Sequence, residues 1–194
     1  MKLSIDLACD SPKAWIEAVM NDFDAFLQDH ADCERKASAM AMSFVAKFPD
    51  RLEIIPELIE TAVEELEHFQ SVYDIMKKRD VQLMHEIKQD MYVKQLIDFC
   101  RSGKEERFMD RLLLASVVEC RGAERFRLVY EALPTGELKK FYQELWASEA
   151  KHGHLFVKMA LNYFEERKVY DRLVEFNEYE ATVIKSLPIK AALH

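Results

Sequence analysis

The sequence predicts an all-α fold made of a few long helices. The chain of 194 residues contains only 4 Gly and 5 Pro, whereas average usage is roughly 7% and roughly 5%. Tight turns and hairpins depend on these residues, so β-sandwiches, barrels and Gly-rich nucleotide-binding loops are disfavoured. Apolar residues also recur at helical spacing over long stretches, which is typical of amphipathic helices. We therefore expect a helical bundle.

Two helices are expected before Pro49. Ser11 and Pro12 suit the N-cap and the first position of a helix, and apolar spacing extends this helix to about His30. Asp32 is a candidate cap for a second helix, which should end before Pro49 because proline cannot continue it.

The remaining helices are bounded by Pro56, Pro134 and Pro188. They are expected at about 56–79, as shorter pieces within 81–103, and at about 104–133, 136–167 and 170–187. No linker rich in Ser, Pro or Gly interrupts the chain, so residues 1–194 are predicted to form a single domain.

Composition limits the functional classes. With 27 basic and 35 acidic residues the net charge is −8, which disfavours a general nucleic-acid or membrane binder but leaves room for a local basic patch. The first ten residues do not resemble a secretory signal, and no apolar run is long enough to cross a membrane. The four cysteines form no CxxC spacing, which favours reduced thiols in a cytoplasmic protein.

Two predicted helices carry the pattern Glu-x-x-His, at Glu65–His68 and at Glu149–His152. Residues three apart share a helix face, so each pair can direct a carboxylate and an imidazole at one point. The preceding helices carry Glu34, 31 residues before Glu65, and Glu119, 30 residues before Glu149. The two sets form a pseudo-repeat.

The turns support this pairing. In an antiparallel helix hairpin, residues equidistant from the turn lie at the same height. Glu34 and Glu65 are equidistant from Pro49–Asp50, and Glu119 and Glu149 are equidistant from Pro134. Glu124 is about 7.5 Å out of register with Glu149 at 1.5 Å per residue, so Glu119 is the better candidate.

Four carboxylates in a bundle core would repel one another unless cations compensate them. One Glu from each of two helices and Glu-x-x-His from two others is the ligand set of ferritin-like di-iron and di-manganese proteins. Mixed oxygen and imidazole ligands suit iron or manganese. The predicted metal ligands are Glu34, Glu65, His68, Glu119, Glu149 and His152. His30, one turn before Glu34, could support that carboxylate.

Beyond these ligands, four segments resemble the bacterial tRNA 2-methylthio-N6-isopentenyladenosine hydroxylases of the ferritin-like di-iron superfamily. The segments are Asp29–Ala37, Glu64–Phe69, Glu119–Phe126 and Ser148–His152, within a similarity from about Trp15 to Phe164. This chain has Cys120 and Gly122 where that family commonly has Ala and Ser, a difference that bears on packing rather than on ligation.

The resemblance implies a ferritin-like four-helix bundle with additional flanking helices. It also implies an O2-dependent monooxygenase with two iron ions that hydroxylates the prenyl side chain of a tRNA adenosine. No catalytic residue beyond the metal ligands is expected. Because no flavin or iron–sulfur motif occurs in the sequence, a separate electron-transfer reductase is implied. No membrane partner is expected.

Several local groups of basic residues are candidates for binding tRNA. The candidates singled out are Arg121, Arg125, Lys139 and Lys140. A further basic group comprises Arg101, Lys104, Arg107 and Arg111, in which the last two share a helix face. The alternative functions are ferritin-like iron storage and peroxide handling by a di-metal centre. A metal-free helical protein is a third alternative.

Overall fold

The computed structural model describes residues 4, 6–86 and 89–194, which contain seven α-helices and no strand. The prediction of an all-α fold is confirmed. The helices are α1 (Lys13–Asn21), α2 (Phe23–Lys47), α3 (Ile55–Lys78), α4 (Met91–Asp98), α5 (Lys104–Ala132), α6 (Glu137–Leu161) and α7 (Glu166–Ser186).

The chain divides into two compact units. The α4–α7 unit comprises the described residues up to Ile16, Gln89–Ile189 and His194, and the α2–α3 unit comprises the described part of Glu17–Lys88 together with Lys190–Leu193. The boundary between them falls within α1. The expectation of one domain over residues 1–194 stays a prediction.

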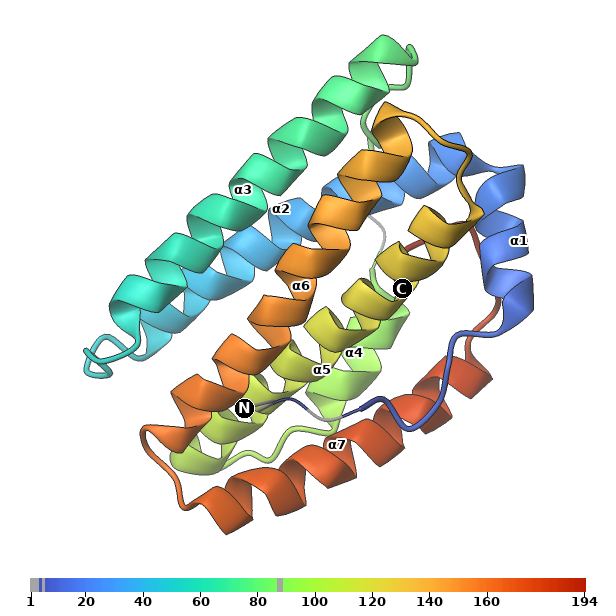
Figure 1. The fold of residues 1–194 in the computed structure, drawn as a ribbon. Helices are drawn as coiled ribbons and strands as arrows, with labels where there is room; N and C mark the ends of the chain where they lie inside the picture. Colours follow the sequence, from blue (N-terminus) through green and yellow to red (C-terminus); the bar gives the residue numbers. More distant parts are fainter. Residues whose placement is uncertain (1–3, 5, 87–88) are drawn as a thin grey trace. The chain divides into compact units, whose positions relative to one another are not determined.

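The α2–α3 unit is an antiparallel helix hairpin (Figure 1). Buried apolar side chains of both helices form its core, including Phe26, Phe44 and Val72. The Ser38 hydroxyl donates to the backbone carbonyl oxygen of Ala62 at 2.7 Å, which links the two helices near their middle.

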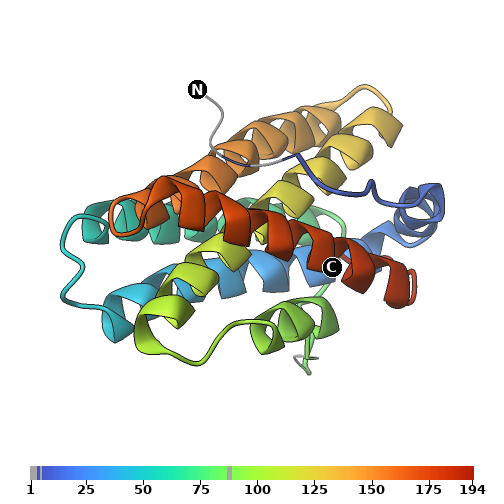
Figure 2. The ribbon, with the colours of Figure 1, turned by 90° about the horizontal axis from the view of Figure 1, so that it is seen from below.

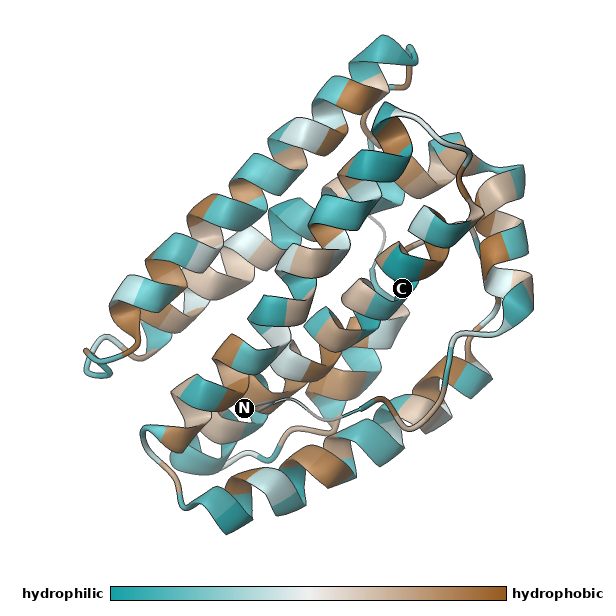
Figure 3. Cartoon of the chain, in the orientation of Figure 1, coloured by the Kyte–Doolittle hydropathy of each residue, from teal (hydrophilic) through white to brown (hydrophobic). Residues whose placement is uncertain are grey.

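The α4–α7 unit contains a second antiparallel hairpin, α5 with α6, and α7 packs against α5 and α4 (Figure 2). Hydrophilic and hydrophobic residues alternate along the long helices (Figure 3), and α5 carries buried residues along its length on several of its faces. A helix that neighbours cover on several sides needs apolar residues on several faces. Helix α5 is therefore the central element of this unit.

The first two helix boundaries differ from the prediction. The break expected near Asp32 lies at Asp22 instead, where the Asp22 carboxylate accepts a hydrogen bond from the backbone N–H of Ala25 and caps α2. Asp32 lies within α2 and pairs with Arg35 and Lys36, three and four residues further along. Both aspartates are plausible caps by residue type, and the structure uses Asp22 as the cap and Asp32 in ion pairs within the helix.

The boundary between α6 and α7 also differs. Helix α6 ends at Leu161 rather than near Arg167, and α7 begins at Glu166. Tyr163 and Phe164, in the connecting turn, both contact the ring of Phe108. Contact of these half-buried rings with the buried Phe108 ring offsets the loss of helical hydrogen bonds, in a segment that has no Gly or Pro to indicate a turn.

The four cysteines are free thiols, as the sequence predicts. Among the described residues, no helix is long and apolar enough to span a bilayer.

Candidate metal centre

The α2–α3 unit brings Glu34, Glu65 and His68 together as the turn symmetry predicts. One ligand atom of each lies within 4.8 Å of the others. His68 Nδ1 is 3.4 Å from Glu65 Oε2 and 3.7 Å from Glu34 Oε2. Both carboxylates are buried, with exposed fractions of 3% for Glu34 and 1% for Glu65. Two carboxyl groups and one imidazole therefore converge inside this hairpin.

His30 lies against this group. It is fully buried, and its Nε2 is 2.6 Å from Glu34 Oε1, the carboxylate oxygen other than the one nearest His68. The ring also packs on Phe26, with 5.8 Å between ring centroids. A hydrogen bond from His30 Nε2 orients the Glu34 carboxylate and leaves Oε2 directed at His68. His30 therefore supports the Glu34 carboxylate, as expected from its position one turn earlier in the helix.

The α5–α6 hairpin repeats the arrangement. Ligand atoms of Glu119, Glu149 and His152 lie within 4.8 Å of one another. His152 Nδ1 is 3.1 Å from Glu149 Oε2, so Nδ1 is the nitrogen nearest the carboxylate in both Glu-x-x-His segments. All three residues are buried, Glu119 being 7% exposed.

The donor set of each hairpin fits a divalent transition metal. Carboxylate oxygens and imidazole nitrogens at this mutual distance suit iron or manganese, and no thiolate belongs to either trio. Buried carboxylates are costly without a compensating cation. The buried Glu and His groups are thus compatible with metal binding in both hairpins.

Close contact between α5 and α6 lies beside the second trio. The Ser116 hydroxyl donates to the backbone carbonyl oxygen of Gly153 at 2.7 Å. A Cβ atom at Gly153 would lie 2.7 Å from Cys120 Sγ, whereas the nearest backbone atoms of α5, at 3.5 and 3.7 Å, are at ordinary contact distance, so the Cys120 side chain is what disfavours a larger residue next to His152. At Gly122 a Cβ atom would meet only a Phe126 ring carbon at 4.0 Å, and no such requirement exists there.

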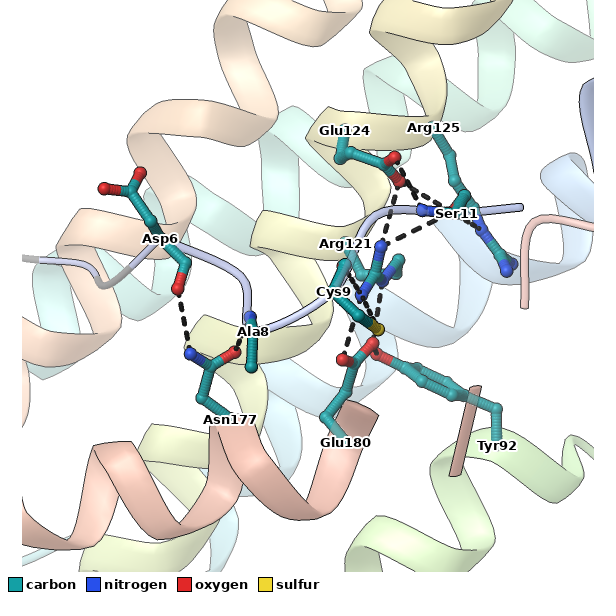
Figure 4. A network of polar contacts seen from close by, with 10 residues as sticks. All are labelled: Asp6, Ala8, Cys9, Ser11, Tyr92, Arg121, Glu124, Arg125, Asn177 and Glu180. Atoms are coloured by element: carbon teal, nitrogen blue, oxygen red, sulfur yellow. Dashed lines mark hydrogen bonds and ion pairs between the residues drawn. The ribbon is translucent and has the colours of Figure 1, made fainter. Parts of the chain in front are cut away.

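Glu124, which the register argument sets apart from the ligands, has a different role. Its two carboxylate oxygens accept from the backbone N–H and the hydroxyl of Ser11, at 3.0 and 2.7 Å (Figure 4). It also accepts from Arg121 Nη1 at 3.1 Å. Glu124 therefore anchors the N-terminal segment to α5.

Arg121 is the centre of a buried polar network (Figure 4). Its guanidinium is fully buried and donates to both carboxylate oxygens of Glu180 on α7, at 2.7 and 2.9 Å. It donates as well to the carbonyl oxygen of Cys9, and the Tyr92 hydroxyl donates to Glu180. Burial lowers the pKa of Arg121, but the hydrogen bonds and charge of Glu180 outweigh it and raise the pKa above its ordinary value.

Arg125 extends this network. Its Nε donates to the Ser11 hydroxyl at 3.1 Å, and its guanidinium lies 4.7 Å from the ring centroid of Trp15. Burial lowers the pKa of Arg125 to about 10. Glu180 and Tyr92 were not predictable from the sequence, since they lie 59 residues after and 29 residues before Arg121 and share no motif with it.

This placement bears on the four residues expected to bind tRNA. Arg121 and Arg125 are 0% and 5% exposed, so their guanidinium groups are occupied inside the protein and not offered to a phosphate. Lys139 donates to the carbonyl oxygen of Leu133. Lys140 is exposed and lies 3.6 Å from a carboxylate oxygen of Glu144. Of these four residues, only the two lysines keep a side chain that tRNA could reach.

Comparison with known proteins reveals relatives over almost the whole chain. A family model described as tRNA-(MS[2]IO[6]A)-hydroxylase (MiaE) matches residues 2–194. A Pseudomonas putida protein named tRNA 2-(methylsulfanyl)-N(6)-isopentenyladenosine(37) hydroxylase is 36% identical over 163 residues, which cover 84% of this chain and 78% of that protein. A Salmonella typhimurium protein of the same name is 24% identical, with 93% and 84% covered.

A solved structure is similar as well. It is described as protein 43 with aldehyde deformylating oxygenase activity from Synechococcus, and it matches with a TM-score of 0.91 and 28% identity. The match covers 97% of this chain and 94% of that one. This neighbour is a ferritin-like helical bundle, which confirms the predicted fold class.

Proposed function

Because the chain belongs to the tRNA-(MS[2]IO[6]A)-hydroxylase family, we propose that it is a di-iron monooxygenase acting on tRNA. The substrate would be 2-methylthio-N6-isopentenyladenosine in tRNA, hydroxylated on its isopentenyl side chain. The observation that carries this proposal is the repetition of one buried trio, Glu with Glu-x-x-His, in both helix hairpins of a chain that the family matches throughout.

The six predicted ligands would bind two iron ions as one centre. Glu34, Glu65 and His68 would come from the α2–α3 unit, and Glu119, Glu149 and His152 from the α4–α7 unit. The two units would then act as one ferritin-like di-iron domain. In both Glu-x-x-His segments, the histidine Nδ1 lies next to the carboxylate three residues earlier, which supports a shared role. Two divalent ions would also balance the charge of four carboxylates.

The reaction has a defined balance. One C–H bond of the prenyl group becomes C–OH, the second oxygen atom of O2 leaves as water, and two electrons and two protons are consumed. Two bound iron ions would supply the redox chemistry that activates O2. The electrons require an external electron-transfer reductase, and a tRNA substrate implies a cytoplasmic location.

The chain's own residues contribute orientation and exclusion of water. Burial of all four carboxylates keeps bulk water away from the ligand atoms. His30 holds Glu34 in one orientation, and the hydrogen bond from Ser116 to Gly153 sets the register of α5 against α6 beside Glu119 and His152.

The test combines nucleoside mass spectrometry with iron analysis. tRNA from a strain lacking this protein should lose the hydroxylated adenosine, the wild-type chain should restore it, and Glu119→Gln should not. Glu131→Gln provides a control on the same helix, since Glu131 is exposed and pairs with Arg127. Persistence of the modified nucleoside in the deletion strain would refute the substrate assignment.

Iron content distinguishes the alternatives. The proposed centre predicts about two iron ions per reconstituted wild-type chain and a loss in Glu119→Gln. Many more iron ions per chain in a large closed assembly would indicate iron storage instead. Iron-dependent peroxide consumption without hydroxylation of tRNA would indicate the peroxide-handling alternative.

A further inference from the structure

Three basic side chains follow one face at the start of α5. Lys104, Arg107 and Arg111 are spaced by three and four residues, so they lie in one row along the helix. Lys104 and Arg107 are exposed, and Arg111 is partly exposed. The row belongs entirely to the α4–α7 unit.

No carboxylate pairs with this row within the part of the chain that the structure describes. The residues three or four positions away from each member include a single acidic one, Asp110. The Asp110 carboxylate is fully buried and engaged by Arg101 and Arg172, which donate to it at 2.7 to 3.1 Å. Asp110 is therefore engaged by other arginines and does not neutralise the row.

Other surface cations of the same unit differ in this respect. Arg127 pairs with Glu131, and Arg167 with Asp171, in each case four residues further along the helix. Acidic residues outnumber basic ones by 35 to 27 in the whole chain, so unpaired neighbouring arginines are not a consequence of composition.

The row is unfavourable for the isolated helix. Arg107 and Arg111 are like charges one turn apart, which destabilises a helix. Cations near a helix N-terminus also oppose the helix dipole. Burial lowers the pKa of Arg111 from its ordinary value, and neighbouring Arg107 adds to this effect. An anionic ligand would relieve these costs.

We propose that Lys104, Arg107 and Arg111 form a docking site for backbone phosphates of the tRNA substrate. The guanidinium forks of Arg107 and Arg111, one helical turn of about 5.4 Å apart, can hold one phosphate together or two successive ones. Glu119 lies eight positions after Arg111 on the same helix, about 12 Å along its axis. This inference rests on the proposed function.

The test measures binding of unhydroxylated tRNA to the iron-loaded full chain across a series of salt concentrations. Arg107→Ala with Arg111→Ala should weaken binding about tenfold or more at low salt and reduce the slope of log K against log salt by about one to two. Arg127→Ala with Arg167→Ala removes the same charge from paired positions and should leave the affinity within about twofold. Circular dichroism and iron content should match wild type in both variants.

Each other outcome has a defined meaning. If the wild-type chain binds and hydroxylates tRNA while the Arg107 and Arg111 variant binds equally well, the docking assignment is wrong and the proposed function stands. If both double variants lose affinity equally, the effect is one of net charge and the docking assignment is also wrong. If that variant keeps tRNA affinity but is reduced more slowly by its electron donor, the row serves an acidic protein, which overturns the proposal. If the wild-type chain neither binds nor hydroxylates tRNA, the proposed function itself fails.

Discussion

Ser116 on α5 donates its hydroxyl hydrogen to the backbone carbonyl oxygen of Gly153 on α6, across 2.7 Å. The bond lies three residues before Glu119 and one residue after His152. The α2–α3 hairpin has an equivalent bond from Ser38 to the carbonyl oxygen of Ala62. Both hairpins thus have a hydroxyl contact between their helices within about one turn of predicted ligands.

Substitution of Gly153 tests the close approach of these helices. Gly153→Ala should lower the free energy of unfolding by about 1–3 kcal/mol, because the added Cβ would lie 2.7 Å from Cys120 Sγ. In a Cys120→Ala background the same change should become neutral or stabilising by up to about 1 kcal/mol, since alanine is the better helix former. Urea denaturation of the four chains in this cycle measures the coupling. Equal effects in both backgrounds would show that Cys120 is not the obstacle.

His30 is predicted to position Glu34. His30→Phe preserves an aromatic ring beside Phe26 but removes the hydrogen bond to Glu34 Oε1. Loss of such a supporting group typically reduces metal affinity about 10- to 100-fold, and titration of the apo-protein with Fe(II) measures it. His30→Gln retains an N–H donor and should lose less. Exposed His85→Phe is the matched control, and an equal loss there would argue against a specific role for His30.

The buried pair of Arg121 and Glu180 should stabilise the α4–α7 unit strongly. Arg121→Met leaves the Glu180 carboxylate buried without its cation and should cost about 3–5 kcal/mol. Arg127→Met, at an exposed ion pair, should cost less than about 1 kcal/mol. Chemical denaturation followed by circular dichroism distinguishes the two. Similar losses would mean that the network contributes little beyond a surface pair.

Asp110 should give stability a component that is lost in acid. Burial raises the pKa of Asp110, but hydrogen bonds from Arg101 and Arg172 outweigh it and lower the pKa below its ordinary value. The contribution is present above the unfolded-state pKa of about 3.9 and is lost as pH falls through the lower folded-state value. The difference in unfolding free energy between wild type and Asp110→Asn should therefore be constant from pH 7 to about pH 5 and shrink below about pH 4. A difference that grows in acid would contradict this assignment.

Local patterns predicted what lies within one hairpin. Turn symmetry about Pro49 and Pro134 paired Glu34 with Glu65 and Glu119 with Glu149, and the structure brings each pair together. Hairpin partners share one turn, so their relative height follows from counting residues. The same count separated Glu124 from the ligands, and its carboxylate binds Ser11 instead.

Contacts between distant elements were not predictable in this way. Four-residue spacing places Arg121 and Arg125 on one helix face but does not say whether another helix covers that face. Glu180, the partner of Arg121, comes from α7. Similarly, Asp22 and Asp32 are equally good caps by residue type, but in the structure Asp22 caps α2 whereas Asp32 pairs with Arg35 and Lys36 within it.

The Arg121–Glu180 pair also has a consequence for synthesis on the ribosome. The two residues are 59 positions apart, which corresponds to about 3–12 s of translation at 5–20 residues per second. During this interval α5 and α6 have been made, but the charge at the centre of α5 has no counter-ion from α7. Until Glu180 is made, Arg121 has the carboxylate of Glu124 on α5 as a partner but lacks the paired hydrogen bonds from α7. A chain that ends before Glu180 would lack the two hydrogen bonds that this carboxylate accepts from the Arg121 guanidinium.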